Sequence, residues 1–203
     1  MKLAGEQRLL LPGRAGSLEV VLNDPGATRR ALALIAHPHP LHGGTLDNKV
    51  VQTLAKHFFG QGCVAVRMNF RGVGASEGVF DQGVGETQDW LLAAHSMSER
   101  FGGLPLALAG FSFGAFVQAR VAEQLQPSRL ILVAPAVRHF PIPRVPEYTL
   151  VVHGEEDDVV PLQDVLEWAR PQSLPVVVVP GAGHFFHGKL TDLARVLQRS
   201  CPC

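Results

Sequence analysis

The sequence predicts an α/β protein built around one mostly parallel, doubly wound sheet. Six short apolar runs have the length of strands and do not alternate with polar residues, which is typical of strands covered on both faces. Segments with helical periodicity separate these runs, so right-handed crossovers are expected to join parallel strands. A length of 203 residues suits one domain better than two, and a single domain over residues 1–203 is predicted.

The first 24 residues are predicted to form an antiparallel hairpin at the edge of this sheet. Leu18, Val20 and Leu22 stand at every second position, which predicts a half-exposed strand. Leu9–Leu11 precedes that strand across a Pro-Gly turn. The six apolar runs that follow are Ala31–Ala36, Cys63–Phe70, Leu104–Phe111, Arg129–Pro135, Tyr148–Gly154 and Leu174–Gly181. The total is about eight strands.

The intervening segments carry apolar residues on one helical face. The faces consist of Val50, Val51, Leu54 and Phe58; of Trp90, Leu91 and Ala94; of Leu162, Val165, Leu166 and Ala169; and of Leu190, Leu193, Ala194 and Leu197. Gly60 and Gly62 provide stop signals for the first helix. Ligands of such sheets bind at the carboxyl ends of the strands, so the loops there are expected to carry the chemistry.

Composition excludes several classes of protein. Lys plus Arg number 18 and Asp plus Glu number 18, and this balance argues against a nucleic-acid partner. No apolar run reaches the roughly 18 residues of a membrane span, and the N-terminus does not resemble a signal peptide. Three cysteines cannot make a disulfide framework, so a cytoplasmic location is expected. The tail Cys201-Pro202-Cys203 could hold a metal or form a redox pair, but a four-ligand zinc site needs more partners than it offers.

The strongest chemical signal is Gly110-Phe111-Ser112-Phe113-Gly114. It follows an apolar run and leads into a helical segment, which is the strand–turn–helix context of a nucleophile elbow. The glycines are needed because bulk on either side of the strained serine would clash with the neighbouring strand and helix. We predict Ser112 as a nucleophile at the positive end of a helix; the alternative is a tight turn with an inert serine.

A serine nucleophile needs a base, and the base needs an acid that orients it. In this motif class the order along the chain is serine, acid, histidine. Four acidic residues follow the fifth apolar run, namely Glu155, Glu156, Asp157 and Asp158. We predict Asp157 as the acid and the other three as a solvated loop. His184 follows the sixth run in a Gly-rich loop and is predicted as the base.

The oxyanion hole needs two backbone N–H groups. One is expected from Phe113, directly after the nucleophile, and the other from the loop that begins at His37. Pro38 and Pro40 have no N–H, so His39 or Leu41 donates, and His39 is preferred. Aromatic and apolar residues near the nucleophile and base are expected to line the substrate pocket; those predicted are Phe111, Leu41 and Phe185.

Two loops carry rival interpretations. His37, His39 and His42 could together bind zinc, although the prediction is no metal and no cofactor, with His37 and His42 hydrogen-bonding locally. The glycines of Asn69–Gly78 could indicate phosphate binding, but their spacing is not the dinucleotide fingerprint and no helix follows directly. Arg71 is therefore expected to tie a structural turn together by hydrogen bonds.

These motifs together resemble those of the α/β hydrolases along nearly the whole chain. The chain carries His-Pro-His-Pro, Asn-Phe-Arg-Gly-Val-Gly-x-Ser, Gly-Phe-Ser-Phe-Gly, His-Gly-x-x-Asp-x-Val-Val-Pro and Gly-x-Gly-His. It is most similar to small, lidless bacterial hydrolases of the dienelactone-hydrolase-like group. The resemblance implies an α/β-hydrolase fold and a triad of Ser112, Asp157 and His184. Dienelactone hydrolases proper use cysteine as the nucleophile, and Ala136–Glu147 is too short for a lid domain.

The expected function is that of a carboxylesterase-like serine hydrolase, which cleaves small acyl esters through an acyl-enzyme. A thioesterase or peptidase would use the same triad, because pocket shape decides the leaving group. A non-catalytic ligand-binding protein on a hydrolase fold and a metal-dependent hydrolase are the remaining alternatives. The expected partner is a small-molecule ester, and a homodimer through the edge hairpin or an exposed helix stays open.

Overall fold

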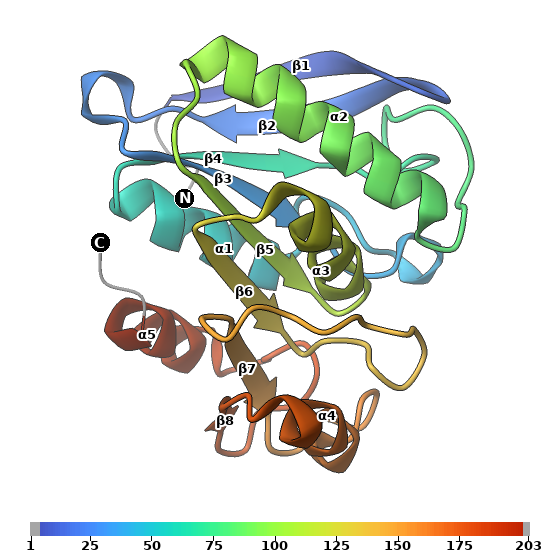
Figure 1. Ribbon diagram of the computed structural model, residues 1–203, viewed down its shortest axis with the longest axis vertical. Coiled ribbons are helices and arrows are strands. Elements are labelled where there is room, and N and C mark those ends of the chain that lie inside the picture. Colours follow the sequence, from blue (N-terminus) through green and yellow to red (C-terminus); the bar gives the residue numbers. More distant parts are fainter. Residues whose placement is uncertain (1–4, 201–203) are drawn as a thin grey trace.

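An eight-stranded sheet with the order β1-β2-β4-β3-β5-β6-β7-β8 forms the centre of the protein (Figure 1). The structure, a computed structural model, describes residues 5–200, so the predicted cysteine tail lies outside the described residues. The strands are β1 (Glu6–Gly13), β2 (Gly16–Asn23), β3 (Ala31–Ala36), β4 (Cys63–Met68), β5 (Leu106–Phe111), β6 (Arg129–Val133), β7 (Leu150–Gly154) and β8 (Val176–Val179). The six strands from β3 to β8 pair in parallel, and β2 pairs antiparallel with both β1 and β4. The predicted fold class is confirmed.

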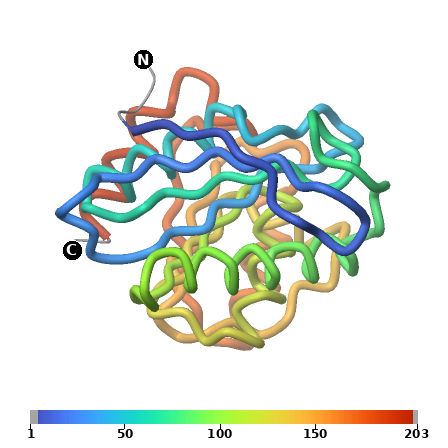
Figure 2. Tube along the Cα trace, turned by 90° about the horizontal axis from the view of Figure 1, so that it is seen from above, coloured from blue at the N-terminus to red at the C-terminus, as the bar shows by residue number. Residues whose placement is uncertain are grey.

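Helices cover both faces of the sheet, as the doubly wound architecture requires. They are α1 (Lys49–Gly60), α2 (Val84–Phe101), α3 (Phe113–Leu125), α4 (Leu162–Ala169) and α5 (Leu190–Ser200). Three short 3₁₀ turns accompany them, η1 (Gly26–Thr28), η2 (Pro40–His42) and η3 (Arg170–Gln172). Buried residues of α2, α3 and α4 form one apolar core with the sheet, and those of α1 and α5 form a second core on the opposite face. Figure 2, which looks from the β1 side, shows α2 in green along one face of the strands.

The predicted hairpin is present, with β1 at the edge, but one expectation about it is wrong. We expected a half-exposed strand at residues 18–23, and β2 is instead buried on both faces. Val20 and Val21 point to opposite faces and are both fully buried. Leu18, Val20 and Leu22 pack into the core, β2 lies inside the sheet between β1 and β4, and the exposed positions fall on the edge strand β1.

The chain between β6 and β7 packs partly against the core on the α2, α3 and α4 face, through Ile142 and Val145. Residues 134–149 contain neither helix nor strand, so the predicted absence of a lid domain is confirmed (Figure 1). Among residues 5–200, no helix has the length and apolar character that crossing a bilayer requires.

Candidate active site

The turn between β5 and α3 presents Ser112 at the carboxyl end of the central strand. Ser112 has φ 56° and ψ −116°, a strained conformation for a residue that is not glycine. A Cβ added to Gly110 would lie 2.2 Å from the Gly114 carbonyl oxygen, and one added to Gly114 would lie 2.4 Å from the Ala36 carbonyl oxygen. Both glycines are therefore required for the close approach of strand, turn and helix.

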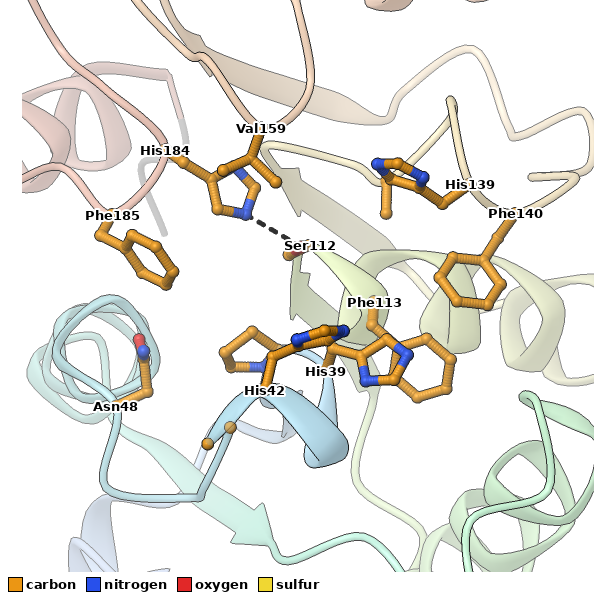
Figure 3. A pocket seen from close by; sticks show the side chains of 14 residues that line it. His39, His42, Asn48, Ser112, Phe113, His139, Phe140, Val159, His184 and Phe185 are labelled. Atoms are coloured by element: carbon orange, nitrogen blue, oxygen red, sulfur yellow. Dashed lines mark hydrogen bonds between the residues drawn. The ribbon is translucent and has the colours of Figure 1, made fainter.

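The three residues predicted as a triad meet in one buried hydrogen-bonded chain. The loop after β8 places His184 Nε2 3.0 Å from Ser112 Oγ, the contact drawn as a dashed line in Figure 3. The loop after β7 places Asp157 Oδ2 2.7 Å from His184 Nδ1. A carboxylate oxygen only accepts, so Nδ1 carries the proton and Nε2 presents its lone pair to the serine hydroxyl.

Backbone amides hold the carboxylate of Asp157 in place. Its Oδ1 accepts hydrogen bonds from Val159 N at 3.0 Å and Val160 N at 2.8 Å. These two contacts fix the orientation of the carboxylate toward His184. Of the neighbouring acids, Glu155 is exposed and accepts from Gly181 N at 2.9 Å instead.

A second histidine, which sequence reasoning missed, lies behind this carboxylate. His153 is fully buried near the end of β7, and its Nε2 lies 2.8 Å from Val160 O and 3.5 Å from Asp157 Oδ2. Burial lowers the pKa of His153, which keeps the ring neutral with its proton on Nε2. The signal available in the sequence was its position, four residues before the acid and next to the last residue of the preceding strand.

The two residues predicted to supply the oxyanion-hole amides, Phe113 and His39, both line the pocket that contains Ser112. Phe113 is the first residue of α3, where the amide has no intrahelical acceptor. In the loop after β3, Leu41 N donates to His39 Nδ1 at 3.2 Å, so that amide is already used. His39 N donates to no other described residue. The predicted preference for His39 over Leu41 is thus consistent with the loop geometry.

His37 is part of the core rather than a metal ligand. Its Nε2 accepts from Phe70 N at 3.0 Å, and its Nδ1 donates to Pro38 O at 2.7 Å. Burial lowers the pKa of His37 to about 4, so the ring is neutral and both nitrogens are occupied. The rival zinc interpretation therefore loses one of its three ligands. Within residues 5–200, no group of three or more His, Cys, Asp or Glu side chains is arranged to hold a metal.

A pocket of about 410 Å³ opens in front of Ser112 (Figure 3). Of the three residues predicted to line it, Phe185 does so. Leu41 does not, because its side chain is 69% exposed on the outside of η2. Phe111 is fully buried and packs beneath the His184 ring, at 5.1 Å between centroids. Lining residues that were not predicted for the pocket include His42, Asn48, His139, Phe140 and Val159.

The glycine-rich loop after β4 is tied to α2, as predicted for Arg71. The guanidinium donates to both carboxylate oxygens of Asp89, at 2.8 and 2.9 Å, and to Gly85 O at 3.1 Å. These donors are occupied by the protein itself, which supports the structural interpretation of the loop over phosphate binding.

Comparison with known proteins agrees with the fold. The model of the family described as serine aminopeptidase, S33, matches residues 39–147. A lidless α/β serine hydrolase from Xanthomonas campestris superposes with a TM-score of 0.91 and 36% identity, over 98% of this chain and 95% of that chain. An α/β serine hydrolase homologue from Coxiella burnetii gives 0.91 and 40%, over 98% and 99%. A dienelactone hydrolase from Anabaena variabilis shares the fold, with a TM-score of 0.74 and 17% identity over 96% of each chain.

Proposed function

The chain belongs to the α/β-hydrolase family that the serine aminopeptidase (S33) model describes, and from this premise we propose that it is a carboxylesterase-like serine hydrolase acting on small acyl esters. The observation that carries the proposal is the buried chain from Ser112 through His184 to Asp157, beside an open pocket. The strained turn at Ser112 is a second support, because such strain is retained where it serves chemistry.

In the proposed reaction His184 Nε2 takes the Ser112 proton while Ser112 Oγ attacks the acyl carbonyl carbon. The negative charge that develops on the carbonyl oxygen is stabilised by the amides of Phe113 and His39. His184 then returns the proton to the leaving alcohol, and the acyl group remains on the serine as an ester. A water molecule, deprotonated by His184, attacks this ester and releases the acid. Asp157 stabilises the imidazolium that forms in both steps.

The lining of the pocket favours an ester over a peptide with a free amino terminus. An α-ammonium group needs a carboxylate to pair with, and no Asp or Glu of the described residues 5–200 lines the pocket. The absence of a lid domain between β6 and β7 leaves the site open, which suits a small substrate. A purely ligand-binding role is disfavoured because nucleophile, base and acid are all present and connected.

A fluorophosphonate probe, which labels only activated serines, tests the proposal. Wild-type protein should be labelled with and without EDTA, whereas Ser112→Ala should not be labelled. Ser98→Ala, on α2 and outside the pocket lining, is the matched control and should be labelled like the wild type. Turnover of para-nitrophenyl acetate and of the corresponding anilide then separates esterase from amidase activity. Absence of labelling in the wild type would refute the proposed function.

A further inference from the structure

Among residues 5–200, the titratable side chains that line the pocket are all histidines. Besides His184, this described lining contains His39, His42 and His139, and no Asp, Glu, Lys or Arg. His39 and His42 come from the loop after β3, and His139 comes from the segment between β6 and β7. Figure 3 shows the first two approaching Ser112 from one side and His139 from the other. Three imidazoles from two separate loops thus line the same pocket as Ser112.

The ring N–H groups of these imidazoles can donate hydrogen bonds to a ligand. His39 Nδ1 accepts from Leu41 N, so the proton of the neutral ring is on Nε2. Within the described chain, the ring nitrogens of His42 and His139 make neither a hydrogen bond nor an ion pair. The rings of His39 and His42 lie 4.6 Å apart between centroids.

Other charged groups around the pocket do not neutralise this cluster. Arg138 pairs with Asp164 of α4 at 3.6 Å, Asp157 is occupied by His184, Asp81 lies 3.9 Å from Arg71, and His187 stacks on Phe185. Burial lowers the pKa of His39, and the neighbouring charges of His42 and His139 lower it further. An anion bound beside His39 would act against both effects, because a nearby negative charge favours the protonated imidazole.

We propose that the side of the pocket formed by His39, His42 and His139 binds a carboxylate on the substrate, so that the enzyme prefers small esters carrying a second, anionic group. The inference rests on the proposed function, since it names the substrate class of the same site. The aromatic rings of Phe113, Phe140 and Phe185 also line the pocket and suit an apolar spacer between ester and carboxylate. Charge-assisted hydrogen bonds from imidazolium to carboxylate would fix the orientation of the substrate.

The proposal predicts a preference that grows as the histidines gain protons. Two matched substrate pairs test it: the para-nitrophenyl monoester of adipic acid against para-nitrophenyl hexanoate, and para-acetoxybenzoate against para-acetoxybenzamide. The first pair carries the anion on the acyl side and the second on the alcohol side. The ratio of kcat/KM within a pair cancels the titration of His184, which both substrates share. Histidines change charge between about pH 8 and pH 6, and the ratio should rise about fivefold over this range for at least one pair.

Variants identify the groups responsible. His42→Gln and His139→Gln should each lower the ratio and flatten its pH dependence, while His95→Gln, an exposed position on α2, should behave as the wild type. A ratio that stays constant with pH in both pairs and is insensitive to His42→Gln and His139→Gln would overturn the substrate class while leaving the esterase intact. No Ser112-dependent turnover of any of the four esters would instead refute the proposed function and this inference with it.

Discussion

Replacing Asp157 by Asn tests the proposed acid with almost no change in shape. The carboxylate has two occupied oxygens: Oδ1 accepts from the amides of Val159 and Val160, and Oδ2 faces His184 Nδ1 at 2.7 Å. An asparagine has only one oxygen for these two roles. With its oxygen toward the two backbone amides, its NH₂ group meets His184 Nδ1 and turns that nitrogen into an acceptor. The His184 proton then moves to Nε2, which can no longer deprotonate Ser112.

The opposite orientation of the amide has a different signature. The NH₂ group would face the N–H groups of Val159 and Val160, and two backbone hydrogen bonds of about 1 kcal/mol each would be lost. This loss would lower the Tm by about 4–8 °C for a chain of this size. The first orientation is favoured because it keeps the hydrogen bonds from Val159 and Val160, and because the asparagine NH₂ group can donate to His184 Nδ1. We therefore expect a normal Tm and a kcat lowered about 10⁴-fold, equivalent to about 5.5 kcal/mol.

Steady-state hydrolysis of a para-nitrophenyl ester and thermal unfolding, measured on the same preparation, give both quantities. Asp158→Asn is the matched control, because Asp158 is the exposed neighbour in the same loop and should retain the wild-type kcat within about twofold. Should Asp157→Asn keep more than about one hundredth of the wild-type kcat with an unchanged Tm, the assignment of Asp157 as the orienting acid would be wrong.

Three further perturbations test the residues that pack around the site and support it. The pKa of His37 falls to about 4 on folding, below the ordinary 6.5, so the stability that its neutral ring contributes is complete above pH 6.5 and is lost as pH falls toward 4. In urea unfolding, this residue should make the protein about 2 kcal/mol less stable at pH 5 than at pH 7.5. H37Q should lack this pH-dependent difference. Gly114→Ala puts a Cβ 2.4 Å from Ala36 O, and we expect a loss of about 1–3 kcal/mol in thermal unfolding together with reduced turnover; unchanged stability would contradict the packing argument. Arg71→Lys cannot reproduce the two-pronged contact with Asp89, so denaturant unfolding should lose about 2 kcal/mol, and a loss below about 0.5 kcal/mol would speak against that contact.

The local patterns of the sequence predicted most of the secondary structure because each depends on near neighbours. The run Ala31–Ala36 is β3 with the same bounds, and the helical face that contains Leu54 and Phe58 is buried in α1. Burial was harder to predict. The alternation in β2 suggested one exposed face, but exposure depends on which strand occupies the edge, and the sheet order decides that.

In the candidate site, too, some features could be predicted from the sequence and others could not. The elbow at Ser112 and the loops that carry Asp157 and His184 follow from motifs whose order along the chain is tied to the ends of successive strands. The pocket lining did not follow from them. Leu41 is close to His39 in sequence but lies on the outside of its turn, whereas His139 comes from a segment without periodicity or motif.

The sequence by itself therefore determined the alternation of strands and helices, the strained turn at the nucleophile and the positions of its partners along the chain. Only the tertiary structure decided which side chains share one space. It brought His39, His42 and His139 around a single pocket and placed His153 behind the carboxylate of Asp157. The physical reason is that periodicity and turn chemistry act over a few residues. Distances between loops depend instead on the order and register of eight paired strands.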